Sequence, residues 1–214
     1  MDKKLPLTVA ITGASGALYA VRLGQALLQA QQPFHLILSD AAKEVWRFEM
    51  GRALGQTPYE IRQTLATAFG GDSFTLFDVN SLTAPPASGS VPSAGMVVIP
   101  CSMGTLAHIA HGLADNLIHR AADVVIKEKR PLVIVPREAP LSEIHLENLL
   151  KLSRLGAHVI PAMPGFYHHP RTIDDLVDFV VARVLDALKI DHSLSRRWDE
   201  SKVAAELFEG GHEI

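Results

Sequence analysis

Cysteine and long hydrophobic runs are scarce in this chain, and neither sign of charge predominates. The 214 residues contain a single cysteine, Cys101, which excludes an internal disulfide and any metal site built from several cysteines. The net charge of −3 provides no positive field that would favour nucleic acid or an anionic membrane. No apolar stretch is long enough to cross a bilayer, and the first residues lack the hydrophobic segment of a signal peptide. We therefore expect a cytoplasmic protein.

The apolar content of the chain is sufficient for a full core. Hydrophobic residues make up 48% and charged residues 20%, a composition typical of globular proteins. We expect one domain over 1–214, ending in a polar C-terminal tail over 193–214. Strand-like runs occur at Thr8–Ile11, His35–Leu38, Met96–Ile99, Leu132–Val135 and His158–Ile160, and helical patterns at about 17–30, 40–50, 103–128, 142–155 and 172–189. This alternation predicts an α/β fold in three α/β/α layers with a central parallel sheet.

Residues 51–94 interrupt the alternation. They contain a weak helical pattern near 58–69, a possible short strand at Phe74–Phe77, and a segment rich in proline and serine over 83–92. A long irregular loop inside a compact domain is usually functional or mobile, and a flexible surface linker is the simpler alternative.

The first predicted strand leads into a turn in which two glycines flank a serine, Gly13-Ala14-Ser15-Gly16. A strand–turn–helix corner of this kind directs backbone N–H groups and a helix N-terminus at one point, which suits a phosphate or an electron-rich ring. The dinucleotide-binding pattern requires a glycine where Ser15 stands, so the turn presents a hydroxyl there instead. An ordinary tight turn is the alternative.

Small hydroxyl and charged side chains follow the other predicted strands. Ser39 follows the second strand, Ser102 and Thr105 follow the third, and Arg137 and Glu138 follow the fourth. Ligands of open parallel sheets bind beyond the carboxyl ends of the strands, so these residues predict a site for an anion or for the polar atoms of a flavin. Any one hydroxyl alone is more simply a helix cap. Glu138 is a candidate general acid if its carboxyl is buried.

Three cations stand out on the predicted helices. Arg120 and Lys127 are seven residues apart and share one helix face at a separation of about 10 Å. Arg183 projects at the edge of the apolar arc of 172–189, on a side that we expect to lie away from the aspartates of that helix, including Asp186. Solvated surface charge or a snorkelling side chain would explain these residues. The alternative is that Arg183 faces a cleft and holds a phosphate.

Several other residues invite a functional interpretation. Glu49 is a weaker acid–base candidate, since surface charge on a helix is its default explanation. Trp198 lies in the polar tail, and we expect its indole to pack across a cleft or against a neighbouring subunit. His168 and His169 have no carboxylate at a spacing that completes a metal site, so we expect no metal. Cys101 follows a buried strand, and packing explains it better than a catalytic thiolate because no motif supplies a base.

As a set, the motifs resemble the UbiX-type flavin prenyltransferases, a family formerly described as aromatic-acid decarboxylases. The resemblance covers about residues 7–190, plus Trp198. The motifs are TGASGA at 12–17, PCSMGT at 100–105, RAADV at 120–124, KEKRPL at 127–132, PREAP at 136–140, PGFYH at 164–168 and TIDDLVDF at 172–179. Seven motifs in the right order are far more specific than any one of them.

The resemblance implies a flavodoxin-like or Rossmann-like domain that binds reduced FMN as a substrate. The enzyme would join the dimethylallyl group of dimethylallyl monophosphate to N5 and C6 of that flavin, without a metal. The product, prenylated FMN, would become the cofactor of a UbiD-type decarboxylase in ubiquinone or aromatic-acid metabolism. The family implies a homododecamer whose ligand sites lie between chains.

The resemblance also implies roles for individual residues. Those implied to hold FMN are Gly13, Ala14, Ser15, Ser39, Ser102, Met103, Gly104, Thr105 and Arg137. Those implied to bind the prenyl phosphate are Tyr167 and Arg183 with Lys127 beside them, and, in parts of the site completed across subunit contacts, Arg120, Ser88 and Gly89. The implied catalytic roles are proton movement near N5 for Ser15 and Glu49, phosphate stabilisation for Lys127, protonation of the leaving phosphate for Glu138, and stabilisation of the allyl cation for Trp198.

Two alternatives keep flavin binding but change the function. The first is an FMN-dependent decarboxylase of the peptidyl-cysteine type, whose relatives rely on a histidine early in the chain and on an Asn-containing motif. The candidate helix offers no such histidine. The second is a non-catalytic flavin-binding module, which would have no need of Arg183 at the apolar edge of a helix or of Glu138.

Overall fold

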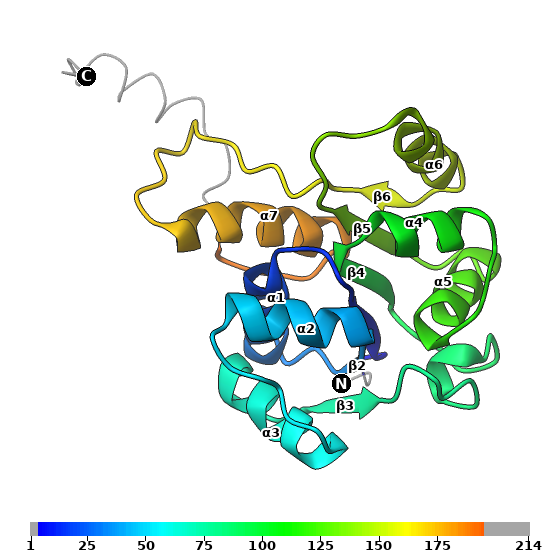
Figure 1. Ribbon diagram of the computed structural model, residues 1–214, viewed down its shortest axis with the longest axis horizontal. Helices are drawn as coiled ribbons and strands as arrows, with labels where there is room; N and C mark the ends of the chain where they lie inside the picture. The colour runs from blue at the N-terminus through cyan, green and yellow to red at the C-terminus, as the bar shows by residue number, and fades with distance from the viewer. Residues whose placement is uncertain (1–3, 195–214) are drawn as a thin grey trace.

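Six parallel strands form a single sheet in the computed structural model, which describes residues 4–194 (Figure 1). The strands are β1 Leu7–Ile11, β2 Phe34–Leu38, β3 Phe74–Phe77, β4 Gly95–Cys101, β5 Leu132–Pro136 and β6 His158–Val159. Their spatial order, β3-β2-β1-β4-β5-β6, is that of the Rossmann fold. The order reverses between β1 and β4, so a ligand crevice is expected beyond the carboxyl ends of these two strands.

Helices cover both faces of the sheet. They are α1 Ala17–Gln29, α2 Asp40–Glu49, α3 Pro58–Phe69, α4 Met103–Ala110, α5 Leu117–Lys127, α6 Glu143–Arg154 and α7 Ile173–Ala187, with a 3-10 turn at Pro85–Ala87. One buried cluster joins Leu7, Val9 and Ile11 of β1 to residues of α1, α2, α3 and α7. A second cluster joins Ala10 to residues of α4, α5 and α6. The predicted three-layer α/β/α architecture is confirmed.

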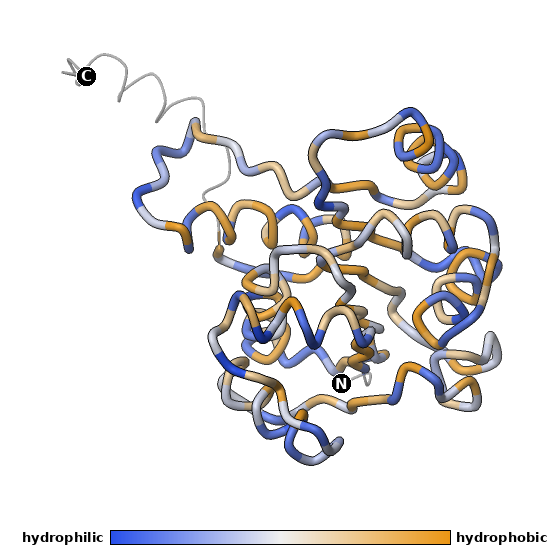
Figure 2. Tube along the Cα trace, viewed as in Figure 1, coloured by the Kyte–Doolittle hydropathy of each residue, from blue (hydrophilic) through white to orange (hydrophobic). Residues whose placement is uncertain are grey.

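Hydropathy along the chain follows these layers. Hydrophobic segments concentrate along the inner strands and the helix faces that meet them (Figure 2). Residues of β1, β4 and β5 are buried throughout, as expected for strands covered on both sides. Within residues 4–194, no helix combines the length and apolarity needed to cross a membrane.

The prediction of one continuous helix over 103–128 is wrong. The structure has two helices there, α4 and α5, separated by residues 111–116. Gly112 adopts a φ of 68°, and the Asn116 side chain accepts a hydrogen bond from the His119 N–H at 3.0 Å, which caps α5. The weak helix near 58–69 and the short strand at Phe74–Phe77 are confirmed.

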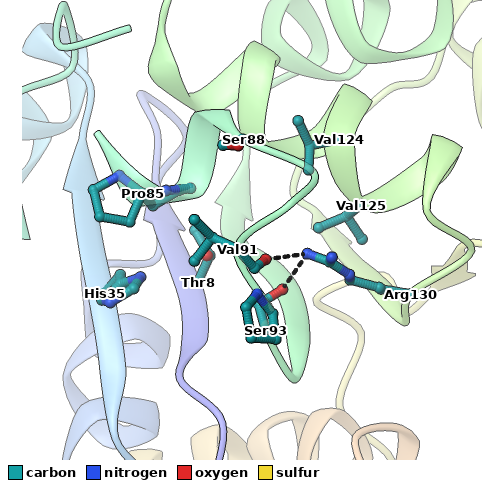
Figure 3. A pocket seen from close by; sticks show the side chains of 11 residues that line it. Thr8, His35, Pro85, Ser88, Val91, Ser93, Val124, Val125 and Arg130 are labelled. Atoms are coloured by element: carbon teal, nitrogen blue, oxygen red, sulfur yellow. Dashed lines mark hydrogen bonds between the residues drawn. The ribbon is translucent and has the colours of Figure 1, made fainter. Parts of the chain in front are cut away.

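The irregular loop after β3 is anchored on α5 and its C-terminal turn. Arg130 donates hydrogen bonds to the Gly89 carbonyl at 2.7 Å, the Val91 carbonyl at 2.8 Å and Ser93 Oγ at 3.2 Å. Figure 3 shows this guanidinium beside a small cavity between the loop, the sheet and α5. The cavity volume is about 10 Å³, which suits a water and not a flavin. These contacts do not fit a flexible linker.

Candidate active site

The glycine-rich turn after β1 is joined to the end of β4 by one buried hydroxyl. Thr12 is 1% exposed; its Oγ1 donates to the Pro100 carbonyl at 2.9 Å and accepts from the Ser102 N–H at 2.8 Å. A Cβ on Gly13 would lie 2.5 Å from the Ala41 Cβ, so glycine is needed where the turn meets α2. The predicted binding turns after β1 and β4 therefore form one unit at the switch point of the sheet.

A carboxylate occupies the N-terminus of α1. Glu49, the last residue of α2, accepts hydrogen bonds from the Gly16 N–H at 3.0 Å and from the Ala17 N–H at 2.7 Å. The helix has no side-chain cap of its own, so Glu49 takes the position that the helix dipole offers to an anion. Glu49 is exposed, as its explanation as surface charge expects, and its carboxylate also lies at the residue that follows Ser15.

Ser39 and Ser102 are both helix N-caps. Ser39 Oγ accepts a backbone N–H of α2 at 3.1 Å; Ser102 Oγ accepts the Thr105 N–H at 3.4 Å and donates to Thr105 Oγ1 at 3.1 Å. A Cβ built on Gly104 would meet no atom within 4 Å, so the backbone of the first turn of α4 is open to a ligand. The Met103 side chain packs in the core at 7% exposure, which leaves its backbone as the part that can contact a flavin.

Arg137 carries a buried donor without a partner. It directly follows β5, and its N–H donates to the Cys101 carbonyl at 3.3 Å. Its Nε is buried and has no hydrogen-bond partner among the described residues, an arrangement that fits an acceptor supplied by a ligand. Glu138 beside it is half-buried, and its Oε1 accepts the Ala139 N–H at 3.1 Å.

The interpretation of Cys101 as a packing residue is confirmed. The side chain is fully buried, and burial raises the pKa of its thiol far above neutrality. A thiol in that environment is not a nucleophile at physiological pH.

A groove of about 340 Å³ lies beside the carboxyl ends of β5 and β6. Its lining residues are Val159, Ile160, Pro161, Met163, Phe179, Val180 and Arg183. The Ala162 N–H donates to the Pro136 carbonyl at 3.0 Å, which joins the groove to the strand end that carries Arg137. Tyr167 packs edge-to-face on Phe179 with ring centres 5.7 Å apart. Tyr167 and Arg183, predicted to act on the same phosphate, thus adjoin one groove.

The expected orientation of Arg183 away from Asp186 is wrong. Arg183 Nη2 lies 2.6 Å from Asp186 Oδ2 in an ion pair. Residues three apart on a helix are neighbours on its surface, and the long arginine side chain covers that distance. The pairing leaves Arg183 at the edge of the groove.

A second group of predicted residues gathers on α5. Arg120 Nε donates to the Ala87 carbonyl at 3.1 Å, next to Ser88 in the irregular loop. Lys127 forms an ion pair with Glu128 directly above Gly89, where an added Cβ would lie 2.6 Å from Lys127 Nζ. Arg120 and Lys127 of α5 therefore both contact the irregular loop of their own chain.

The two cation groups lie on opposite faces of the sheet. Helix α5, which carries Arg120 and Lys127, packs in the cluster with α4 and α6, whereas α7, which carries Arg183, packs in the cluster with α1 (Figure 1). Within a single chain, Lys127 is therefore not beside Tyr167 and Arg183. The remaining candidate, Trp198, lies outside the described residues.

The sequence reasoning missed a cluster between α4 and α5. One ligand atom each from His108, Asp115 and His119 lies within 4.8 Å of the others. The two imidazoles stack at 4.4 Å with 13° between their planes, so their in-plane lone pairs run side by side and do not converge as a metal requires. His108 instead pairs with Asp115 at 3.1 Å, and burial, with the nearby His108, lowers the pKa of His119. A single helix over 103–128 would not bring His108, Asp115 and His119 together, so the sequence did not indicate this cluster.

Comparison with known proteins gives consistent matches. A family model described as Flavoprotein matches residues 1–185. The flavin prenyltransferase UbiX of Alkalihalophilus pseudofirmus is 53% identical over 197 residues, covering 91% of this chain and 96% of that protein.

Two solved structures share the fold at high coverage. AnUbiX (PadA1), in complex with FMN and dimethylallyl pyrophosphate, superposes with a TM-score of 0.81 at 39% identity, covering 92% of this chain and 98% of the other. A dodecameric FMN-dependent UbiX-like decarboxylase from Escherichia coli O157:H7 superposes with a TM-score of 0.80 at 47% identity, covering 91% and 100%.

Proposed function

The chain belongs to the UbiX-type flavin prenyltransferases, and we propose that it joins the dimethylallyl group of dimethylallyl monophosphate to N5 and C6 of reduced FMN. The observation that carries this proposal is the junction at the end of β5. The buried Arg137 Nε, which has no partner among the described residues, directly follows Pro136, and the Pro136 carbonyl accepts the Ala162 N–H beside the groove that Arg183 lines. We infer that the flavin and the prenyl phosphate bind next to each other at this strand end.

The residues at the switch point fit FMN. In our proposal, backbone groups of Gly13, Ala14 and Ser15 contact the flavin from the turn after β1. Ser39, Ser102, Met103, Gly104, Thr105 and Arg137 complete the site from the ends of the neighbouring strands. Two features support this assignment: the open space at Gly104 and the unsatisfied donor of Arg137. Reduced FMN supplies the nucleophilic N5 and C6 positions, and the protein supplies orientation and proton transfer.

The cations act on the leaving phosphate. When the allylic carbon–oxygen bond breaks, the electron pair goes to phosphate, where negative charge grows as positive charge grows on the allyl carbon. Arg183 stabilises the phosphate from the groove, and Tyr167 binds beside it. Glu138 delivers a proton to the departing phosphate. Ser15 and Glu49 move protons near N5, and stabilisation of the allyl cation is assigned to the indole of Trp198, which lies outside the described residues.

Lys127, Arg120, Ser88 and Gly89 complete the phosphate site from another chain. Their position on the opposite face of the sheet supports this arrangement, because one chain alone cannot bring them to Arg183. We propose a homododecamer, like the E. coli structure, with the sites between chains. We also propose that the product passes to a UbiD-type decarboxylase, and that the enzyme works in the cytoplasm.

Mass spectrometry of the flavin tests the reaction directly. The purified protein is incubated anaerobically with reduced FMN and dimethylallyl monophosphate, and the extracted flavin is weighed. We expect a flavin heavier by one C5 prenyl unit. Unchanged FMN with both the monophosphate and the diphosphate donor, in protein shown to bind FMN, would overturn the proposal. Release of carbon dioxide from a peptide with a C-terminal cysteine would then support the decarboxylase alternative.

The role of Arg183 is tested separately. Arg183→Ala is expected to abolish prenyl transfer and to leave FMN binding intact, because its contact is with the prenyl phosphate. Full prenylation by this variant would refute the assignment while leaving the reaction itself established.

A further inference from the structure

The Asp186 carboxylate is shared between two partners. Its Oδ2 pairs with Arg183 Nη2 at 2.6 Å, and its Oδ1 lies 3.0 Å from His192 Nε2. The His192 side chain is only 9% exposed, whereas Arg183 and Asp186 are 46% and 36% exposed. The carboxylate therefore connects a half-buried imidazole on one side to the guanidinium at the groove on the other.

The hydrogen bonds of His192 favour one tautomer of its ring. The Leu194 N–H donates to His192 Nδ1 at 3.3 Å, so Nδ1 is an acceptor. Nε2 then carries hydrogen and donates to Asp186. Because His192 Nε2 holds Asp186 Oδ1, the Asp186 carboxylate is restricted to one orientation, in which Oδ2 is directed at Arg183.

The turn that ends α7 brings His192 back against the helix. Lys189 adopts a φ of 56°, its N–H donates to the Asp186 carbonyl at 3.0 Å, and the Ile190 N–H donates to the Leu185 carbonyl at 2.9 Å. Ile190 and Leu194 pack against the core cluster of α1 and α7. The position of His192 is therefore set by backbone and core contacts, and it does not depend on the ion pair alone.

We propose that Asp186, held by His192, is a positioning residue that orients Arg183 toward the prenyl phosphate. This inference rests on the proposed function. The ion pair uses Nη2, while a guanidinium has five N–H donors in a rigid planar fork, so donors remain for a phosphate. An arginine without Asp186 would sample many rotamers and would lose that freedom on binding its ligand.

Two roles for Asp186 predict opposite changes in the affinity for the prenyl phosphate when its charge is removed. If Asp186 served only to neutralise Arg183, its removal would strengthen attraction for a phosphate dianion. If it positions Arg183, its removal weakens binding of the prenyl phosphate. The measurement is the dissociation constant of dimethylallyl monophosphate by calorimetry, with the FMN dissociation constant recorded in parallel on the assembled protein.

Asp186→Asn is expected to raise the dissociation constant of dimethylallyl monophosphate roughly 10- to 100-fold, as small displacements of a positioning group do. FMN binding stays unchanged. Asp174→Asn is the matched control, since it removes the same charge from an exposed position in the first turn of α7. His192→Leu shifts binding in the same direction as Asp186→Asn, and His192→Gln, which keeps a donor, restores part of it.

A double variant separates positioning from a general structural effect. If Asp186 acts through Arg183, Asp186→Asn adds nothing to the loss already caused by Arg183→Ala, whereas independent effects would add. Additive losses, tighter binding in Asp186→Asn, or no change in that variant would each overturn the proposal. Failure of the wild-type protein to prenylate FMN would instead refute the proposed function, which the flavin mass assay detects on its own.

Discussion

Thr12→Val removes the one hydroxyl that joins the turn after β1 to the end of β4, while keeping the shape of the side chain. In the variant the Pro100 carbonyl still accepts the Thr12 backbone N–H at 3.3 Å. The Ser102 N–H, however, loses the Thr12 Oγ1 acceptor that lies 2.8 Å away in the native protein. Leaving such a donor unpaired costs about 1–2 kcal/mol, the lower part of the usual range because Ser102 is only half-buried. For a domain of this size, that loss lowers Tm by about 2–8 °C.

Urea unfolding and FMN titration measure the two consequences. We expect a lower free energy of unfolding and weaker FMN binding, because the turns that form the flavin edge are no longer fixed to each other. Thr8→Val is the control, since Thr8 lies in the same strand but lines the small cavity, away from the glycine-rich turn (Figure 3). If the free energies of unfolding of Thr12→Val and Thr8→Val agree within about 0.5 kcal/mol and both variants bind FMN equally, the Thr12 hydroxyl does not hold the two turns together.

Three further changes probe single contacts. Glu49→Gln should lower stability by about 0.3–1 kcal/mol in low salt by removing the charge at the N-terminus of α1, and a loss independent of salt would contradict this explanation. Arg130→Met should raise amide hydrogen exchange over 89–93, with Arg52→Met as the control; unchanged protection would show that the loop does not need this anchor. The backbone N–H groups of Arg171 and the next residue lower the pKa of Asp175, so its stabilisation is present above the ordinary pKa and is lost as the pH falls through the folded value. Asp175→Asn should therefore reduce stability at pH 7 and flatten its decline below about pH 4, and an unchanged acid transition would refute it.

The alternation of strands and helices could be read from the sequence because it depends on local periodicity and local signals. The β1 turn, the serine caps and the burial of Cys101 all follow from residues close in the chain. The break between α4 and α5 is also marked by local residues, Gly112 and Asn116. Apolar periodicity continues across both residues, so it predicted one helix.

Contacts between distant segments were not predictable in this way. Glu49 reaches the N-terminus of α1 only because the α/β layers place the end of α2 there. Similarly, the pairing of His192 with Asp186 depends on the chain reversing after Lys189. No periodicity specifies such distances, and the strand order that separates Lys127 from Arg183 is likewise a property of the whole sheet.

The placement of Lys127 and Arg183 on opposite faces of the sheet has a genetic consequence. If both cations hold one phosphate, every catalytic centre combines two copies of the chain, and no single copy is a complete enzyme. Lys127→Ala and Arg183→Ala subunits, each inactive alone, would then regain activity when mixed, because some centres receive both intact side chains. Conversely, a damaged allele would reduce the output of a healthy one in the same cell.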